Sequence, residues 1–240
     1  MAILKNLHRN LEGAVFVNLH VPSGILILDG KALSIRGEKY CEHLVWDTGA
    51  GLLKRRLCPG KESPQIFDDL LQELLGQGIV FTAVTIDGLP GLTQVLEIYG
   101  VSVQRCHVHL LRDIKTGLQM KRFSNHPGNK QKRILFCYCK LLLHSTPETF
   151  LLRWKHFERL IEANLFGLNP IHHNVLQRFR KACRYAFSHF LDPRIPAITN
   201  RLESYIGHFN ARLKTMRGFK KPENAERILI ALHHSLLKSS

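Results

Sequence analysis

The sequence predicts an α/β fold with a mixed β-sheet, and three observations lead to that class. Residues 40–58 contain two apolar-rich runs joined by the short glycine-containing turn 48–51, a pattern typical of an antiparallel hairpin. Residues 81–103 read as strand, helix and strand, which is a βαβ unit whose strands are parallel. Residues 110–196 show apolar spacing near 3.6 and no strand signal, so they predict helices.

The elements follow one another with few ambiguous stretches. The predicted strands are 14–20, 25–28, 40–47, 52–58, 81–86 and 101–103. The run 25–28 is continuously apolar, as expected of a strand buried on both faces, and it ends at Asp29-Gly30. The predicted helices are 64–75, 91–99, 110–123, 130–143, 147–163, 171–190, 197–217 and 222–237.

Charge is distributed very unevenly along the 240 residues, whose formal net charge is +15. Residues 1–104 carry 9 Lys and Arg against 11 Asp and Glu, whereas residues 105–240 carry 25 against 8. A basic half of this size is typical of a protein with a polyanionic partner, and nucleic acid fits better than a membrane surface. Apolar runs fall short of the roughly 20 residues needed to cross a bilayer. The six cysteines lack framework spacing, so we expect free thiols and an intracellular, soluble protein.

A carboxylate stands directly after the predicted strand 81–86, where open α/β sheets place their sites. Taken alone, an Asp-Gly pair such as Asp87-Gly88 is more often an ordinary loop turn, and the surrounding sequence favours the functional interpretation here. The surrounding sequence, TIDGLPGL followed after one helix by QRCHVHLLRDI, combines Asp-Gly, Gly-Leu and a Cys-x-x-His with an Arg on each side. This pattern resembles the second catalytic block of Mutator-type DDE transposases, which are ribonuclease-H-like enzymes that cut and join DNA.

The resemblance extends over about residues 20–237 and implies a specific architecture. That architecture is a ribonuclease-H-like mixed sheet flanked by helices, with an all-helical insertion before the last catalytic helix. It divides the chain into a short N-terminal segment (1–20), the first part of the core (21–115), the insertion (116–196) and the C-terminal helices that complete the core (197–240). Relatives carry a substantial DNA-binding region before the first aspartate, so end recognition by this chain is an open question.

Three carboxylates are implied as the catalytic and metal-binding set: Asp29 on the first long strand, Asp87, and Glu203. Glu203 lies in Thr-Asn-x-x-Glu-Ser, which a basic run and Arg-Gly-Phe follow, and this resembles the glutamate block of the family. In-line displacement at a phosphodiester is served by two divalent ions roughly 4 Å apart. Carboxylate oxygens are the ligands that hard cations prefer, so two Mg²⁺ ions are expected, with Mn²⁺ as a substitute.

Several further side chains have expected roles. Cys106 is expected to be buried, with His109 at the rim of the site. Their spacing is compatible with a metal, but half of a zinc site is not a zinc site, so zinc is not expected. Trp154 has two readings, a base-stacking residue or core, and core is favoured. The pairs His172-His173 and His233-His234 are expected at the surface. We expect DNA contacts from Arg105, His109, Arg112, Asn200, Arg201, Lys214 and Arg217.

The function that the resemblance implies is metal-dependent DNA strand cleavage and strand transfer by a DDE-type transposase. Its expected partners are transposon ends and target DNA, on which it would assemble as a homodimer or larger, in the cytoplasm and on the nucleoid. Two alternatives stay open: a non-catalytic DNA-binding remnant of a transposase, and a nuclease or resolvase on the same fold.

Overall fold

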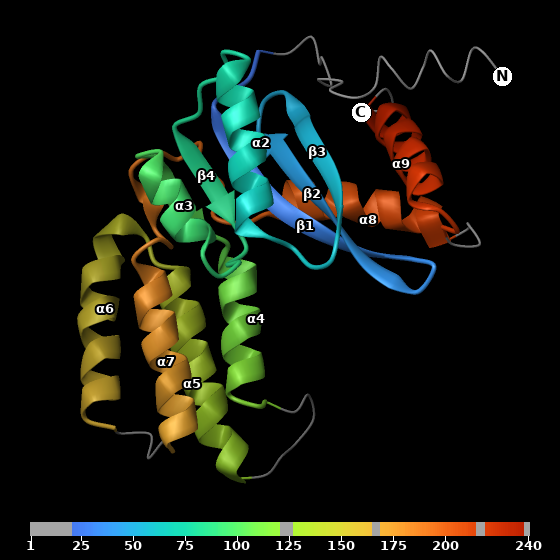
Figure 1. Cartoon of the computed structure of the whole chain (residues 1–240). Coiled ribbons are helices and arrows are strands. Elements are labelled where there is room, and N and C mark those ends of the chain that lie inside the picture. Colours follow the sequence, from blue (N-terminus) through green and yellow to red (C-terminus); the bar gives the residue numbers. More distant parts are fainter. Residues whose placement is uncertain (1–20, 121–126, 165–168, 215–218, 238–240) are drawn as a thin grey trace, which may run out of the picture. The chain divides into compact units, whose positions relative to one another are not determined.

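A computed structural model describes residues 21–120, 127–164, 169–214 and 219–237 (Figure 1). The chain forms two compact units. The first lies within the ranges Met1–Thr82 and Asn200–Ser240, and the second is Ala83–Thr199. Within the described residues, no helix is both long enough and apolar enough to cross a bilayer.

The first unit contains an antiparallel meander in the order β3-β2-β1: β1 (Ile25–Ile35), β2 (Glu38–Asp47) and β3 (Gly51–Pro59). β1 and β2 are joined at Arg36 and Gly37, whose φ angles of 53° and 84° are both positive, as type I′ hairpin turns require. Asp29 pairs with Leu44 in this hairpin. β1 is therefore longer than the predicted 25–28, and Asp29 lies within the strand instead of at its end.

Helices cover this meander, and strand alternation decides what each face carries. α2 (Pro64–Gly76) packs on β2 and β3, α8 (Asn200–Lys214) packs on β1, and α9 (Pro222–Leu237) packs on β3. Ile27 belongs to one core cluster with Leu202 and Tyr205 of α8. Lys31, which follows Asp29 by two residues as Ile27 precedes it by two, donates from its ammonium group to Asn210 of α8. Because side chains alternate along a strand, Asp29 lies on the face of β1 that α8 covers.

The second unit contains the predicted βαβ unit and a group of helices. β4 (Ala83–Ile86), α3 (Leu92–Ile98) and β5 (Ser102–Arg105) form a parallel pair with its crossover helix. The helices that follow are α4 (His107–Gly117), α5 (Pro127–Leu143), α6 (Pro147–Glu162), α7 (Pro170–Cys183) and the short 3₁₀ helix η1 (Ser188–Phe190). α4 contacts α5 and α7, and α5 contacts α6, so these helices lie side by side (Figure 1). The fold class is confirmed as α/β, with antiparallel strands in the first unit, a parallel pair in the second, and helices beside both.

The element order is the one predicted, and the differences lie at element ends. The predicted strand 14–20 lies outside the described residues. The predicted helix 171–190 was wrong in its last third, because α7 ends at Cys183. Bonds to β5 replace the helical ones there, since the Arg105 amide donates to the Tyr185 carbonyl at 2.6 Å and the Ser188 hydroxyl donates to the Val103 carbonyl at 2.6 Å.

Two expectations about single side chains have different outcomes. Trp154 is half-buried against the core of the second unit, between the rings of Phe150 and Phe157, which confirms its reading as core. The expected surface position of the histidine pairs was wrong for His172 and His233, which are 8% and 1% exposed. Both histidine expectations were wrong for the same reason: in each of the two helices, one histidine of the pair lies on the apolar face that is buried.

Candidate active site

Asp29 has a second carboxylate close by, which the sequence did not reveal. Its side chain is half-buried in β1, and one of its carboxylate oxygens lies within 4.8 Å of one from Glu62. Glu62 follows β3 and precedes α2. A Cβ at position 30 would lie 2.5 Å from Cδ of Glu62, so the missing side chain of Gly30 provides the space that the Glu62 carboxylate occupies.

The chemistry of this pair fits a hard divalent cation. Both donors are carboxylate oxygens, the ligand type that Mg²⁺ and Mn²⁺ prefer, and neither sulfur nor imidazole is part of the pair. Two carboxylates this close disfavour each other's ionised form unless a cation lies between or beside them. Asp29 and Glu62 are therefore suitable residues to hold such a metal.

Glu203 lies in the first turn of α8 and is half-buried. Its neighbour Leu202 is fully buried in the core cluster that contains Ile27 of β1. The helix that carries Glu203 thus packs on the same face of β1 that carries Asp29. Burial of Leu202 fixes the rotation of α8 at this turn, because residues on one helix face repeat every three to four positions.

The predicted DNA contacts on α8 have different surroundings. Asn200 is exposed, and the exposed Arg201 guanidinium donates to the Thr48 carbonyl at 2.9 Å. Lys214 ends the helix, but its side chain and all of Arg217 lie outside the described residues.

Asp87 directly follows β4 in the second unit and is half-buried. One of its carboxylate oxygens accepts from the Leu89 amide at 3.1 Å, which is the local bond of an Asx turn. The Arg105 guanidinium donates to the Asp87 carbonyl at 3.2 Å, and a Cβ at Gly88 would overlap that guanidinium. Burial lowers the pKa of Arg105 below its ordinary value. Arg105 therefore holds the turn that carries Asp87.

Cys106 and His109 form a polar contact at the start of α4. Cys106 is fully buried, as predicted, and its amide donates to the Ile86 carbonyl at 2.8 Å. Its sulfur lies 3.4 Å from the Thr199 hydroxyl oxygen and within 4.8 Å of a ring nitrogen of His109. Burial raises the pKa of the thiol, but its bonds to His109 and Thr199 outweigh burial and lower it.

The same contact gives His109 a cationic tendency. The bond to Cys106 raises the pKa of His109, burial opposes that rise, and the charge of Asp87 adds to it. Arg112, one turn along α4, is exposed. His109, whose pKa is raised, and Arg112 thus lie in the first turns of this helix, where cationic side chains are suited to contact phosphate.

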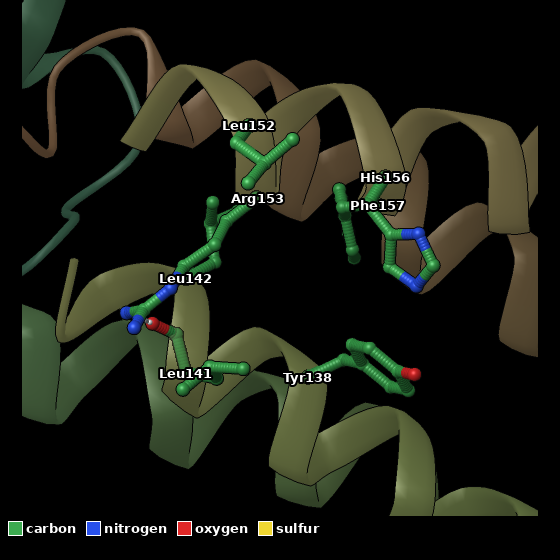
Figure 2. A pocket seen from close by; sticks show the side chains of 7 residues that line it. All are labelled: Tyr138, Leu141, Leu142, Leu152, Arg153, His156 and Phe157. Atoms are coloured by element: carbon green, nitrogen blue, oxygen red, sulfur yellow. Dashed lines mark hydrogen bonds between the residues drawn. The ribbon is translucent and has the colours of Figure 1, made fainter. Parts of the chain in front are cut away.

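The second unit also has a cavity of about 320 Å³ between α5 and α6 (Figure 2). Its lining residues are Tyr138, Leu141, Leu142, Leu152, Arg153, His156 and Phe157. The Arg153 guanidinium donates to the Leu141 carbonyl at 2.9 Å, so its charge is used at the end of α5. A mostly apolar lining that includes no carboxylate does not suit a magnesium site.

Comparison with known proteins gives only weak similarities. The integrase catalytic core of HTLV-2, in a dimeric form with magnesium, is 19% identical with a TM-score of 0.31, covering 41% of this chain and 71% of that one. A chain of the simian T-cell lymphotropic virus intasome, in complex with PP2A regulatory subunit B56 gamma, is 16% identical with a TM-score of 0.32. The match covers 45% of this chain and 43% of that one. A trimeric form of the HTLV-2 core with magnesium is 21% identical with a TM-score of 0.30, and the match covers 41% of this chain and 71% of that one. No protein-family model and no curated protein matches the chain.

Proposed function

We propose that this chain is a polynucleotidyl transferase that cleaves a DNA strand and transfers the resulting 3′ end, using divalent metal ions. The observation that carries the proposal is the pair of carboxylates formed by Asp29 of β1 and Glu62, which follows β3. The helix that carries Glu203 covers the face of β1 on which Asp29 lies. The finer assignment to the Mutator type of DDE transposase rests on the sequence blocks around Asp87 and Glu203.

Asp29, Asp87 and Glu203 would hold the metal, with Glu62 as an additional donor to it. Mg²⁺, when bound, supplies charge stabilisation at the phosphate and a water of lowered pKa. The residues of the chain position the oxygen donors before a metal binds. Gly30 leaves space for the Glu62 carboxylate, and Arg105 holds the turn that carries Asp87.

DNA as the substrate is supported by charge. The basic half of the sequence, residues 105–240, includes Arg112 and the cation-prone His109 close to the turn with Asp87. Phosphate contacts dominate the affinity of most DNA-binding proteins, and they require cations of this kind. Assembly as a homodimer or larger on DNA is part of the proposal.

The deciding experiment is strand transfer with a pre-cut DNA end, measured in Mg²⁺, Mn²⁺, Ca²⁺ and EDTA. We expect product in Mg²⁺ and Mn²⁺, binding without cleavage in Ca²⁺, and no product in EDTA. Asp29→Asn, Asp87→Asn and Glu203→Gln should each lower the amount of product on the order of 10³-fold. Glu223→Gln, which removes an exposed carboxylate from the first turn of α9, is the matched control and should retain full activity.

Two results would contradict the proposal. Equal product in EDTA would show that the reaction does not need a metal. Salt-sensitive DNA binding without product in any metal would instead support the alternative, a non-catalytic DNA-binding protein that has kept the fold.

A further inference from the structure

A cavity of about 260 Å³ lies in the first unit, and Glu62 belongs both to its wall and to the carboxylate pair with Asp29. Its lining residues are Gly30, Ala32, Leu33, Lys39, Tyr40, Cys41, Gly60, Lys61 and Glu62. Pockets for small ligands begin at roughly 300 Å³. This cavity therefore suits one ring-sized group and is too small for a larger ligand.

The cavity is lined by one aromatic residue and several apolar ones. Tyr40 of β2 is half-buried and belongs to the lining. Next to it, Cys41 is 2% exposed. A buried cysteine thiol behaves as a small apolar group.

Two lysines at the cavity differ from the cations of β3. On β3, Lys54, Arg55 and Arg56 are all engaged by carboxylates, those of Glu73, Glu42 and Asp69 among others.

Lys39 and Lys61 are exposed, and neither makes an ion pair with any residue that the structure describes. Their segments are joined, because the Gly60 amide donates to the Lys39 carbonyl at 2.7 Å. Two exposed lysines on adjoining segments of the wall of a ring-sized cavity suit a ligand with a planar group and neighbouring negative charges.

We propose that this cavity is the subsite for one nucleotide of the DNA strand beside the scissile phosphate. Its base would stack on Tyr40, and its flanking phosphates would contact Lys39 and Lys61. The inference rests on the proposed function, since the scissile phosphate is taken to lie at the Asp29 and Glu62 carboxylates, and Glu62 is also part of the cavity wall. Stacking on an aromatic ring is tolerant of sequence, so any base would be accepted.

The test uses the full chain and a DNA duplex with a short 3′ overhang, in which 2-aminopurine replaces each overhang base in turn. Binding is measured in Ca²⁺. We expect 2-aminopurine fluorescence to be quenched by stacking at one overhang position. The quenching should disappear in Tyr40→Leu and persist in Tyr40→Phe, which keeps the ring. Lys39→Ala with Lys61→Ala should weaken overhang binding roughly tenfold and lower the salt slope by about two.

Arg227→Ala is the matched control, because it removes an exposed cation from α9, an element that contributes no residue to the cavity. It should leave the quenching unchanged. No quenched position, or equal quenching in Tyr40→Leu, would overturn the proposal. So would loss of quenching on adding free deoxyadenosine monophosphate while the DNA stays bound, because the cavity would then be a free-nucleotide site.

The two proposals fail separately. If Tyr40-dependent quenching is present but no metal supports strand transfer, the subsite stands and the catalytic proposal fails. If strand transfer depends on Asp29 and Glu203 while quenching is insensitive to Tyr40, the catalytic proposal stands and the subsite fails. Circular dichroism melting of Tyr40→Leu and Tyr40→Phe shows whether both variants are folded.

Discussion

Two carboxylates of the same hairpin, Glu42 and Asp29, have opposite kinds of neighbours. Glu42 is fully buried and accepts from Arg55 at 2.6 Å and from His233 at 2.8 Å. Burial would raise the pKa of Glu42, but these two neighbours lower it below its ordinary value. Asp29 is half-buried and has the carboxylate of Glu62 within 4.8 Å.

The difference separates a stabilising carboxylate from one suited to chemistry. The fold itself supplies positive charge to Glu42, so that residue contributes to stability when it is ionised. Asp29 and Glu62 repel each other, and a divalent cation relieves that repulsion. Removing each carboxylate should therefore change a different property of the protein.

The largest expected effect is on activity. Asp29→Asn should lower strand transfer in Mg²⁺ on the order of 10³-fold, because stabilisation by bound metal contributes several kcal/mol to the transition state. The same variant should unfold in urea within about 0.5 kcal/mol of the parent, since Asn keeps the size of this half-buried side chain and removes a negative charge beside Glu62. A large loss of stability would place Asp29 in the same class as Glu42.

The next effect is on stability. Glu42→Gln should lower the free energy of unfolding by about 3 kcal/mol, because it leaves Arg55 and His233 buried beside a neutral group. Glu226→Gln is the control: Glu226 also pairs with Arg55, at 2.6 Å, but its side chain is 41% exposed. That variant should cost less than about 1 kcal/mol. Equal urea unfolding curves for the two variants would contradict the comparison.

A smaller effect is expected from pH in the second unit. His107 donates from Nε2 to the Ala186 carbonyl at 2.6 Å, and burial lowers its pKa from 6.5 to about 4. A lowered folded-state pKa means that the unfolded chain binds the proton first. The contribution to stability is therefore present above pH 6.5 and is lost as the pH falls towards 4.

This contribution should amount to about 2 kcal/mol between pH 7.5 and 5. His107→Gln keeps a donor near Ala186 and should flatten that part of the pH profile of urea unfolding. If the slope is unchanged in His107→Gln, another group is responsible for the pH dependence.

The smallest effect concerns a single phosphate contact. Arg112→Ala should flatten the salt dependence of DNA binding by about one unit, without regard to DNA sequence. Arg180→Ala is the matched control, because Arg180 pairs with Glu158 at 2.7 Å in the same unit. Fluorescence anisotropy over a salt series measures both. Equal slopes for Arg112→Ala and the parent would remove Arg112 from the DNA-binding surface.

Local patterns were sufficient to predict most of the fold. The order of strands and helices followed from apolar spacing, and the parallel pair β4-β5 followed from strand, helix and strand in sequence. The predicted end of the first long strand, at Leu28, was wrong, because Asp29-Gly30 looks like a turn when the partner strand is not considered. Pairing with Leu44 and His43 of β2 keeps these residues extended.

The site was less predictable, because its contacts join residues far apart in sequence. Glu62 follows Gly60-Lys61 and looks like part of an ordinary turn. Only the folded chain brings it to Asp29. His233 is similar, since its bond to Glu42 spans 191 residues and no local pattern distinguishes it from His234. Positions of Asp29, Asp87 and Glu203 came from motif resemblance, and their joint role is still a prediction.

The first unit is built from two segments separated by the whole second unit, and this has a consequence during synthesis on the ribosome. Residues 83–199 emerge as one continuous segment, so the helical unit can form as soon as it leaves the exit tunnel. The meander emerges earlier, but α8 and α9 emerge only after that segment. Until then Glu42 has Arg55 but not His233 beside it, and the apolar residues around Ile27 and Leu44 lack the helix α8 that covers them. The nascent chain is therefore expected to need chaperone protection at the meander, and not at the helices.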